Sequence, residues 1–239
     1  MIQNAEQLIA LLKAELINRI DEKTRANEQR FFRESIKFYG VKLHEVHKTG
    51  LEFFEMIKDA SKKEVFEICE QLWQSGYMEE SFIACDWAYN FRDKFEKQDI
   101  QVFERWIDQY VSNWASCDAL CNHTMGAFIE MYPEQIEQLK EFARSDNRWK
   151  RRAAAVTLII PARKGKFLSD IRKIAEILMT DKDDLVQKGY GWMLKAASEA
   201  HQQEIFDFVM QNKARMPRTS LRYAIEKMPA ELKSMAMAK

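Results

Sequence analysis

The chain has 239 residues, and its 37 basic and 37 acidic side chains give a formal net charge of zero at pH 7. A hydrophobic content of 46% is that of a globular protein and excludes intrinsic disorder over the whole chain. No apolar run approaches the roughly 20 residues that a membrane-spanning helix needs, so we expect no membrane partner.

Apolar residues recur at helical spacing along almost the whole chain, and glycine and proline are rare. The first predicted helix carries the stripe Leu8, Ile9, Leu12, Leu16 and Ile20. A second helix is predicted with the apolar stripe Phe31, Phe32, Ile36 and Tyr39. Gly40 would form its C-terminal cap. Residues 51–57 belong to a third helix.

From residue 62 onward the predicted helices pair into regular hairpins. First helices are predicted at residues 62–74, 97–111, 133–145, 166–180 and 201–212. Second helices are predicted at residues 79–92, 117–131, 148–160, 184–198 and 217–228. Among these, N-terminal caps are expected at Ser145 or Asp146 and at Asp183 or Asp184.

The fold class predicted from this pattern is all-α, because no stretch alternates as a strand does. We expect an α-solenoid of HEAT-like antiparallel hairpins, wound as a right-handed superhelix with a concave face. The whole chain, residues 1–239, would form a single helical-repeat domain. It would consist of capping helices over 1–60, about five hairpins over 61–230 and a C-terminal tail over 231–239.

One polar position recurs at the repeat period. Asp118, Arg152, Lys188 and Arg222 are separated by 34, 36 and 34 residues, and each falls in a predicted second helix. Equivalent positions of a repeat stack line one surface, so a carboxylate and three cations are predicted to share a face. Trp114 and Trp192 lie four residues from Asp118 and Lys188, and would project to the same side. As an alternative, Asp118 caps its helix.

Charge is distributed unevenly along the sequence. Residues 1–132 carry 16 basic and 23 acidic side chains, whereas residues 133–239 carry 21 basic and 14 acidic ones. The segment 148–173 has a single acid, Asp170, against Arg148, Lys150, Arg151, Arg152, Arg163, Lys164, Lys166, Arg172 and Lys173. Such a concentration of cations is compatible with a polyanion partner, nucleic acid first, but by charge alone an ordinary solvated helix surface is the preferred interpretation.

Two further features allow more than one interpretation. Gly189 and Gly191 interrupt a predicted helix and indicate a close approach, either of a neighbouring helix or of a ligand. Cys117 and Cys121 have helical spacing with His123 nearby, but a closed metal site needs four ligands. With no phosphate loop or nucleophile elbow in the sequence, we expect no metal and no cofactor.

Several segments together resemble the AlkD family of alkylpurine DNA glycosylases, which are built from HEAT-like repeats. They are Asn113-Trp114-Ala115-Ser116-Cys117-Asp118, Arg148-Trp149-Lys150-Arg151-Arg152-Ala153-Ala154 and Gln187-Lys188-Gly189-Tyr190-Gly191-Trp192-Met193-Leu194. The stretch 216–227 is similar to one branch of that family. The better-known members carry Trp where Asn113 stands and Asp where Ala115 stands.

The resemblance implies a role for each matched residue. Asp118 would be the catalytic carboxylate, Trp114 and Trp192 would flank the deoxyribose, and Arg152 would hold the adjacent phosphate. DNA binding would also involve Lys188, Arg222, Arg148, Arg151 and Lys150. The predicted partner is duplex DNA that contains alkylated bases.

The predicted function is therefore hydrolysis of the N-glycosidic bond of cationic alkylated purines, of the 3-methyladenine or 7-methylguanine type. The alternative is a non-catalytic repeat module that binds damaged or branched DNA, or a protein. The chain begins without a basic region ahead of an apolar stretch, so we expect no secretory signal. A cytoplasmic, nucleoid-associated monomer is expected.

Overall fold

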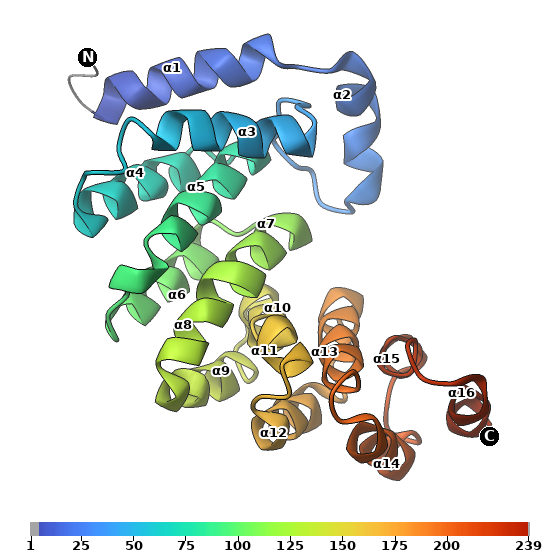
Figure 1. Cartoon of the computed structure of the whole chain (residues 1–239). Coiled ribbons are helices and arrows are strands. Elements are labelled where there is room, and N and C mark those ends of the chain that lie inside the picture. The colour runs from blue at the N-terminus through green and yellow to red at the C-terminus, as the bar shows by residue number, and fades with distance from the viewer. Residues whose placement is uncertain (1–4, 239) are drawn as a thin grey trace. The chain divides into compact units, whose positions relative to one another are not determined.

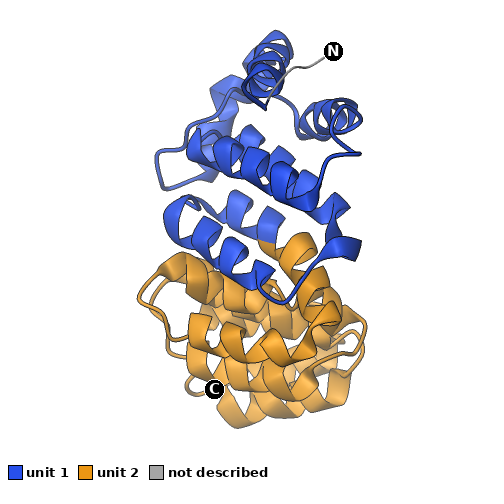
Figure 2. Cartoon of the chain, turned by 90° about the vertical axis from the view of Figure 1, so that its left-hand side faces the viewer, with its two compact units in different colours: residues 1–120 blue, residues 121–239 orange. Residues whose placement is uncertain are grey.

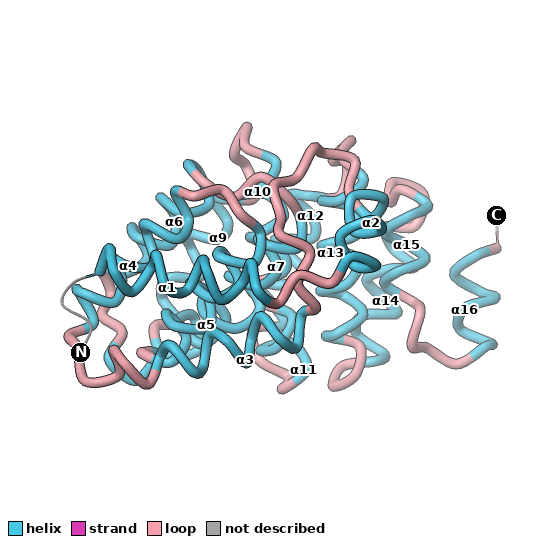
Figure 3. Tube along the Cα trace, turned by 90° about the horizontal axis from the view of Figure 1, so that it is seen from above, coloured by secondary structure: helices cyan, strands magenta, loops and turns pink. Residues whose placement is uncertain are grey.

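The computed structural model describes residues 5–238. The expectation that the chain begins without a secretory signal concerns residues that lie partly outside this range. Throughout the described residues the regular structure is helical (Figure 3). Besides helices, two isolated bridges pair Ile20 with Val41 and Lys37 with Tyr77. The predicted all-α fold class is confirmed. Between residues 5 and 238, no helix combines the length and the apolar character that a bilayer crossing requires.

The chain divides into two compact units, residues 1–120 and 121–239 (Figure 2). The first unit has 16 basic and 22 acidic side chains, a balance of −6, and the second has 21 and 15, a balance of +6. The charge asymmetry of the sequence thus follows the division of the fold. The handedness of the superhelix, its concave face and the extent of the single domain stay predictions.

In the first unit, α5 is the central element. It pairs with α4 as a hairpin and also contacts α3 and α7 (Figure 1). The elements of this unit are α1 (Ala5–Asn18), α2 (Glu22–Glu28), η1 (Gln29–Phe31), α3 (Leu43–Phe54), α4 (Lys62–Gln74), α5 (Met78–Asn90), η2 (Arg92–Lys94), α6 (Asp99–Gln109) and α7 (Trp114–Ala119).

In the second unit, α13 is central and packs against α10, α11, α12 and α15. The elements are η3 (Leu120–Met125), α8 (Gly126–Met131), η4 (Pro133–Gln135), α9 (Ile136–Phe142), α10 (Arg148–Val156), α11 (Ile159–Arg163), α12 (Leu168–Leu178), α13 (Asp184–Ala197), α14 (Gln202–Asn212), α15 (Arg218–Ala224) and α16 (Ala230–Met237). The predicted hairpins from residue 62 onward are all present, whereas α16 occupies the stretch expected to be a tail.

Polar contacts within each unit join residues that are about one repeat apart. In the first unit, Lys62 bonds to Asp99 at 2.8 Å, 37 residues away. In the second, Lys164 bonds to Glu130 at 2.8 Å, 34 residues away. A stack in which each repeat contacts its neighbours produces this spacing.

The segment 29–42, which we call the hook, differs from the prediction. The expected helix over Phe31 to Tyr39 is wrong: helix ends with η1, and the chain then runs in an irregular conformation to α3. Gly40 is no helix cap. It has a φ of 91°, and an added Cβ would lie 2.5 Å from Cβ of Arg25. Glu79 accepts hydrogen bonds from the backbone N–H groups of residues 39, 40 and 41, at 3.0, 2.8 and 3.2 Å.

Two details of the second unit also correct the prediction. The helix predicted over 148–160 ends at Val156, and α11 then runs on to Arg163. Pro161 explains the break, because proline has no N–H for the carbonyl four residues earlier and its ring clashes with that carbonyl. The cap of α10 is Asn147, not Ser145 or Asp146, whereas Asp183 caps α13 as expected.

Gly191 serves the packing of α13 against α15, as the first interpretation expected, whereas Gly189 is not needed for packing. An added Cβ at Gly191 would lie 2.7 Å from Cβ of Tyr223 and 2.9 Å from the carbonyl oxygen of Ser220, both on α15. An added Cβ at Gly189 would meet Cγ of Arg152 at 3.5 Å, an ordinary van der Waals distance. Only Gly191 is therefore required by close approach of the next helix.

This difference predicts opposite outcomes for two alanine substitutions on α13. Gly191→Ala should lower the free energy of unfolding by about 1–3 kcal/mol, because the backbone of α15 cannot yield to the new methyl group. Gly189→Ala should be neutral or stabilising by up to about 1 kcal/mol, because alanine favours helix. Urea unfolding of both variants provides the measurement, and equal destabilisation would contradict the packing difference.

Candidate nucleic-acid interface

In the first unit, the start of α7 places Trp114 and Asp118. Asn113 has extended backbone geometry and its side chain accepts a hydrogen bond from the N–H of Ser116, at 2.9 Å. Asn113 is therefore the N-terminal cap, and the alternative that Asp118 caps the helix is wrong. Trp114 and Asp118 are both half-buried and lie one helical turn apart on the same side of α7.

A buried polar network fixes where α7 begins. The amide of Asn113 donates to Oγ of Ser116 at 3.1 Å, and the hydroxyls of Ser116 and Ser81 are 2.7 Å apart. All three side chains are at most 4% exposed. Because Ser81 belongs to α5, this network ties the first turn of α7 to the central helix of the unit.

The helix continues from α7 directly into the π-helical turn η3, which starts two residues after Asp118. A π-turn changes the rotation of the residues that follow it, and such turns are frequent at functional sites. The residue types of Leu120–Met125 gave no indication of this turn, so the sequence prediction missed it.

The hook supplies the surroundings of the Trp114 indole. The ring of Phe32 stacks on it with centroids 5.3 Å apart and planes 16° apart. The indole N–H also points to the carbonyl oxygen of Phe31 at 3.4 Å. The side chain of Phe31 is 67% exposed. The sequence contained a signal for this contact, two adjacent phenylalanines in a polar segment. From the sequence alone they are interpreted instead as part of the apolar stripe of a helix.

The cysteine next to Asp118 is a buried core residue. Cys117, on α7 beside Asp118, is fully buried, as is Cys69, and Cys85 is 3% exposed. Burial raises the pKa of the Cys85 thiol well above its usual value, and the Asp86 carboxylate, Cys69 and Cys117 act in the same direction. A thiol in such surroundings stays protonated and inert.

In the second unit, Arg152 is a buried residue of α10. It is 5% exposed, it donates to the carbonyl oxygen of Leu185 and it packs against Gly189. The structure therefore brings Arg152 to α13, the helix that carries Lys188 and Trp192.

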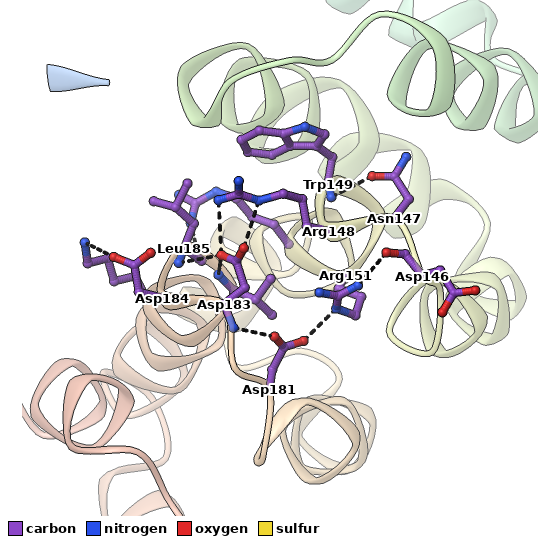
Figure 4. Close-up of polar contacts among 12 residues, drawn as sticks. Asp146, Asn147, Arg148, Trp149, Arg151, Asp181, Asp183, Asp184 and Leu185 are labelled. Carbon is purple, nitrogen blue, oxygen red and sulfur yellow. Dashed lines mark hydrogen bonds and ion pairs between the residues drawn. The ribbon is translucent and has the colours of Figure 1, made fainter. Parts of the chain in front are cut away.

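Two other predicted DNA-binding arginines of α10 are ion-paired with the loop before α13 (Figure 4). Arg148 Nε lies 2.9 Å from Oδ2 of Asp183, and Arg151 Nε lies 2.6 Å from Oδ2 of Asp181. Arg151 also donates to the carbonyl oxygens of Ser145 and Asp146, both at 2.9 Å. These contacts hold α10 against its neighbour, so a role of either arginine in DNA binding stays a prediction.

The remaining predicted residues have different surroundings. The Lys150 ammonium lies 5.3 Å from the ring centre of Phe142, and Trp149 is buried. Lys188 pairs with Asp184 at 3.1 Å, and its side chain is 37% exposed. Trp192 is half-buried one turn further along α13, and Arg222 is exposed on α15, which packs against α13.

A cavity of about 440 Å³ lies between α4 and α6 of the first unit, and none of these residues lines it. Phe66 and Val102 contribute its apolar lining, and its charged groups pair with one another, as Lys62 does with Asp99 and Arg105 with Glu70. Over residues 5–238, no group of three or more His, Cys, Asp or Glu side chains is arranged to hold a metal ion.

The sequence model of the DNA alkylation repair enzyme family matches residues 12–228. The chain belongs to this family. A solved structure described as a predicted DNA alkylation repair enzyme from Enterococcus faecalis has a TM-score of 0.78 at 17% identity, covering 89% of this chain and 98% of that one. At this identity the likeness concerns the fold alone. Comparison with curated proteins finds no match. Family membership supports a role in the repair of alkylated DNA, with DNA as the substrate.

The ion pairs of α10 predict that Arg151 is needed for stability. Arg151→Ala removes the arginine donor from Oδ2 of Asp181 and from two backbone carbonyls, which should lower the free energy of unfolding by about 1–3 kcal/mol. Lys182→Ala, an exposed charge in the same loop, should change it by less than about 0.5 kcal/mol. Urea unfolding measures both. A fully stable Arg151→Ala variant whose salt slope for DNA binding is shallower by about one would show instead that Arg151 binds phosphate.

Proposed function

We propose that the protein is a DNA glycosylase that hydrolyses the N-glycosidic bond of cationic alkylated purines, of the 3-methyladenine or 7-methylguanine type, in duplex DNA. The observation that carries the proposal is the start of α7 at Trp114, which puts Asp118 one turn further on the same side of the helix. The chain's membership of the DNA alkylation repair enzyme family supports it. We propose that it acts as a monomer in the cytoplasm, on the nucleoid.

The chemistry requires a carboxylate but no general acid. A purine alkylated at N3 or N7 is already cationic, so it leaves the sugar as a neutral base. Positive charge develops on the deoxyribose as the bond breaks. In the proposed mechanism the carboxylate of Asp118 stabilises this oxocarbenium ion and orients the attacking water.

Aromatic side chains would support the same developing charge. The face of an indole is electron-rich and attracts a cation within about 6 Å. Trp114, one turn from Asp118, is the proposed contact in the first unit. Trp192 is the proposed contact in the second unit, on the basis of the family resemblance.

The cations of the second unit would bind DNA phosphates without reading sequence. Arg222 is exposed and Lys188 is partly so, which makes them the preferred phosphate contacts. A contact of Arg152 beside the damaged nucleotide is proposed on the family resemblance, and this buried side chain would have to leave the carbonyl oxygen of Leu185 to make it. Arg148 and Arg151 would have to exchange an aspartate for a phosphate, so we expect them to contribute less to DNA affinity. Lys150 completes the proposed set.

The central test is Asp118→Asn, which removes the charge and keeps the shape of the side chain. Release of 7-methylguanine from methylated duplex DNA should fall by roughly 10²–10³-fold, the scale of losing one electrostatic contact to a transition state. Affinity for the same DNA should stay within about twofold, because phosphate contacts dominate it.

Asp59→Asn is the matched control, since it makes the same change at an exposed residue of the same unit. Wild-type excision by Asp118→Asn would refute the catalytic assignment. DNA binding by the wild type without any base release would favour the non-catalytic repeat module.

Arg222→Gln tests the phosphate contacts. The slope of log affinity against log salt concentration should become shallower by about one, because one fewer counterion is released on binding. The loss should be similar for methylated and unmodified duplexes. Titrations of a fluorescent duplex at several salt concentrations give the slope, and an unchanged value would remove Arg222 from the interface.

A further inference from the structure

We infer that Phe32 is a positioning residue of the proposed glycosylase site, which it serves by holding the indole of Trp114. The inference rests on the proposed function for its catalytic consequence. Its structural part concerns the first unit alone, and can be tested without any reaction.

The contacts between the hook and Trp114 restrict the indole in two ways. The offset, near-parallel stack on Phe32, with planes 16° apart, lies against part of one face of the indole and sets its tilt. The contact from the indole N–H to the carbonyl oxygen of Phe31 sets the direction of the ring edge. Trp114 is half-buried, so the two contacts determine which part of the indole is exposed to a substrate.

The hook is held firmly enough to act as a support. Phe32, Ile36 and Met78 form a buried cluster against which Trp114 packs, and they are 9%, 8% and 3% exposed. The side chain of Gln29 closes the hook, because it accepts from the N–H of Ile36 at 3.2 Å and donates to the carbonyl of residue 34 at 2.8 Å.

Helix α5 anchors the hook and α7 together. Met78 belongs to the cluster under Trp114, Glu79 binds three backbone N–H groups of the hook, and Ser81 bonds to Ser116 on α7. One turn of α5 thus places both the backbone of Trp114 and the ring that supports its side chain. This arrangement gives the N-terminal segment a role beyond covering the end of the stack.

The catalytic test uses single-turnover release of 7-methylguanine. Phe32→Leu keeps apolar volume without a ring and should lower the rate constant by up to about tenfold, with DNA affinity within twofold. Phe32→Tyr keeps the ring and should restore the rate. In a Trp114→Ala background, Phe32→Leu should have no further effect, whereas additive losses would show that Phe32 does not act through Trp114.

The second arm is independent of activity. The protein labelled with 5-fluorotryptophan should give a separate ¹⁹F signal for Trp114, assigned with Trp114→Phe among the six tryptophans. Phe32→Leu should shift and broaden that signal and leave the others in place, and Phe32→Tyr should preserve it. Phe31→Ala is the matched control, because its exposed ring is removed while the carbonyl that faces Trp114 remains.

The excision assay and the ¹⁹F measurement together distinguish a failure of the positioning inference from a failure of the proposed glycosylase function. An unmoved Trp114 signal in Phe32→Leu would overturn the positioning inference, whatever the activity. A moved signal in a protein that releases no base would keep the positioning inference and refute the proposed glycosylase function. A moved signal with an unchanged release rate would show that the orientation of Trp114 does not matter for catalysis, and would overturn the inference.

Discussion

Contact between hairpins one repeat apart is the constraint on which the rest of this structure depends. Ser81 meets Ser116 and Lys62 meets Asp99 across that spacing, and in the second unit Lys164 meets Glu130. A short helix is marginal in water by itself, so each hairpin owes its position to the next. The start of α7, and with it the direction of two candidate residues, follows from such a contact.

Ion pairs within the second unit determine which of its cationic side chains remain available to bind a polyanion. The second unit has a net charge of +6, but Arg148 and Arg151 use theirs against Asp183 and Asp181. A cation that already has a partly buried partner gains less from a phosphate than an exposed one does. In the proposed function, the net charge would attract DNA over a distance, whereas exposed side chains such as Arg222 would determine where it is held.

The two units suit different parts of the proposed reaction. The first has a net charge of −6 and carries Asp118, so its field favours a cationic purine and a cationic transition state. The same field would repel phosphate, so in the proposed reaction the affinity for DNA would have to come from the basic unit. In addition to this electrostatic effect, Phe32 would hold the indole of Trp114 in a fixed orientation. An orientation that is set before the substrate binds does not have to be created during the reaction, where it would cost free energy.

The sequence by itself determined the helices and the repeat, because apolar periodicity and a 34- to 36-residue spacing are properties of the chain alone. It did not determine the hook, where burial of Phe32 and the bonds to Glu79 outweigh helical spacing. Nor did it reveal that Asn113 rather than Asp118 caps α7, or that aspartates pair with Arg148 and Arg151 of α10. Only tertiary structure decides these points, because they depend on partners that are distant in the chain or on the residue at which a helix begins.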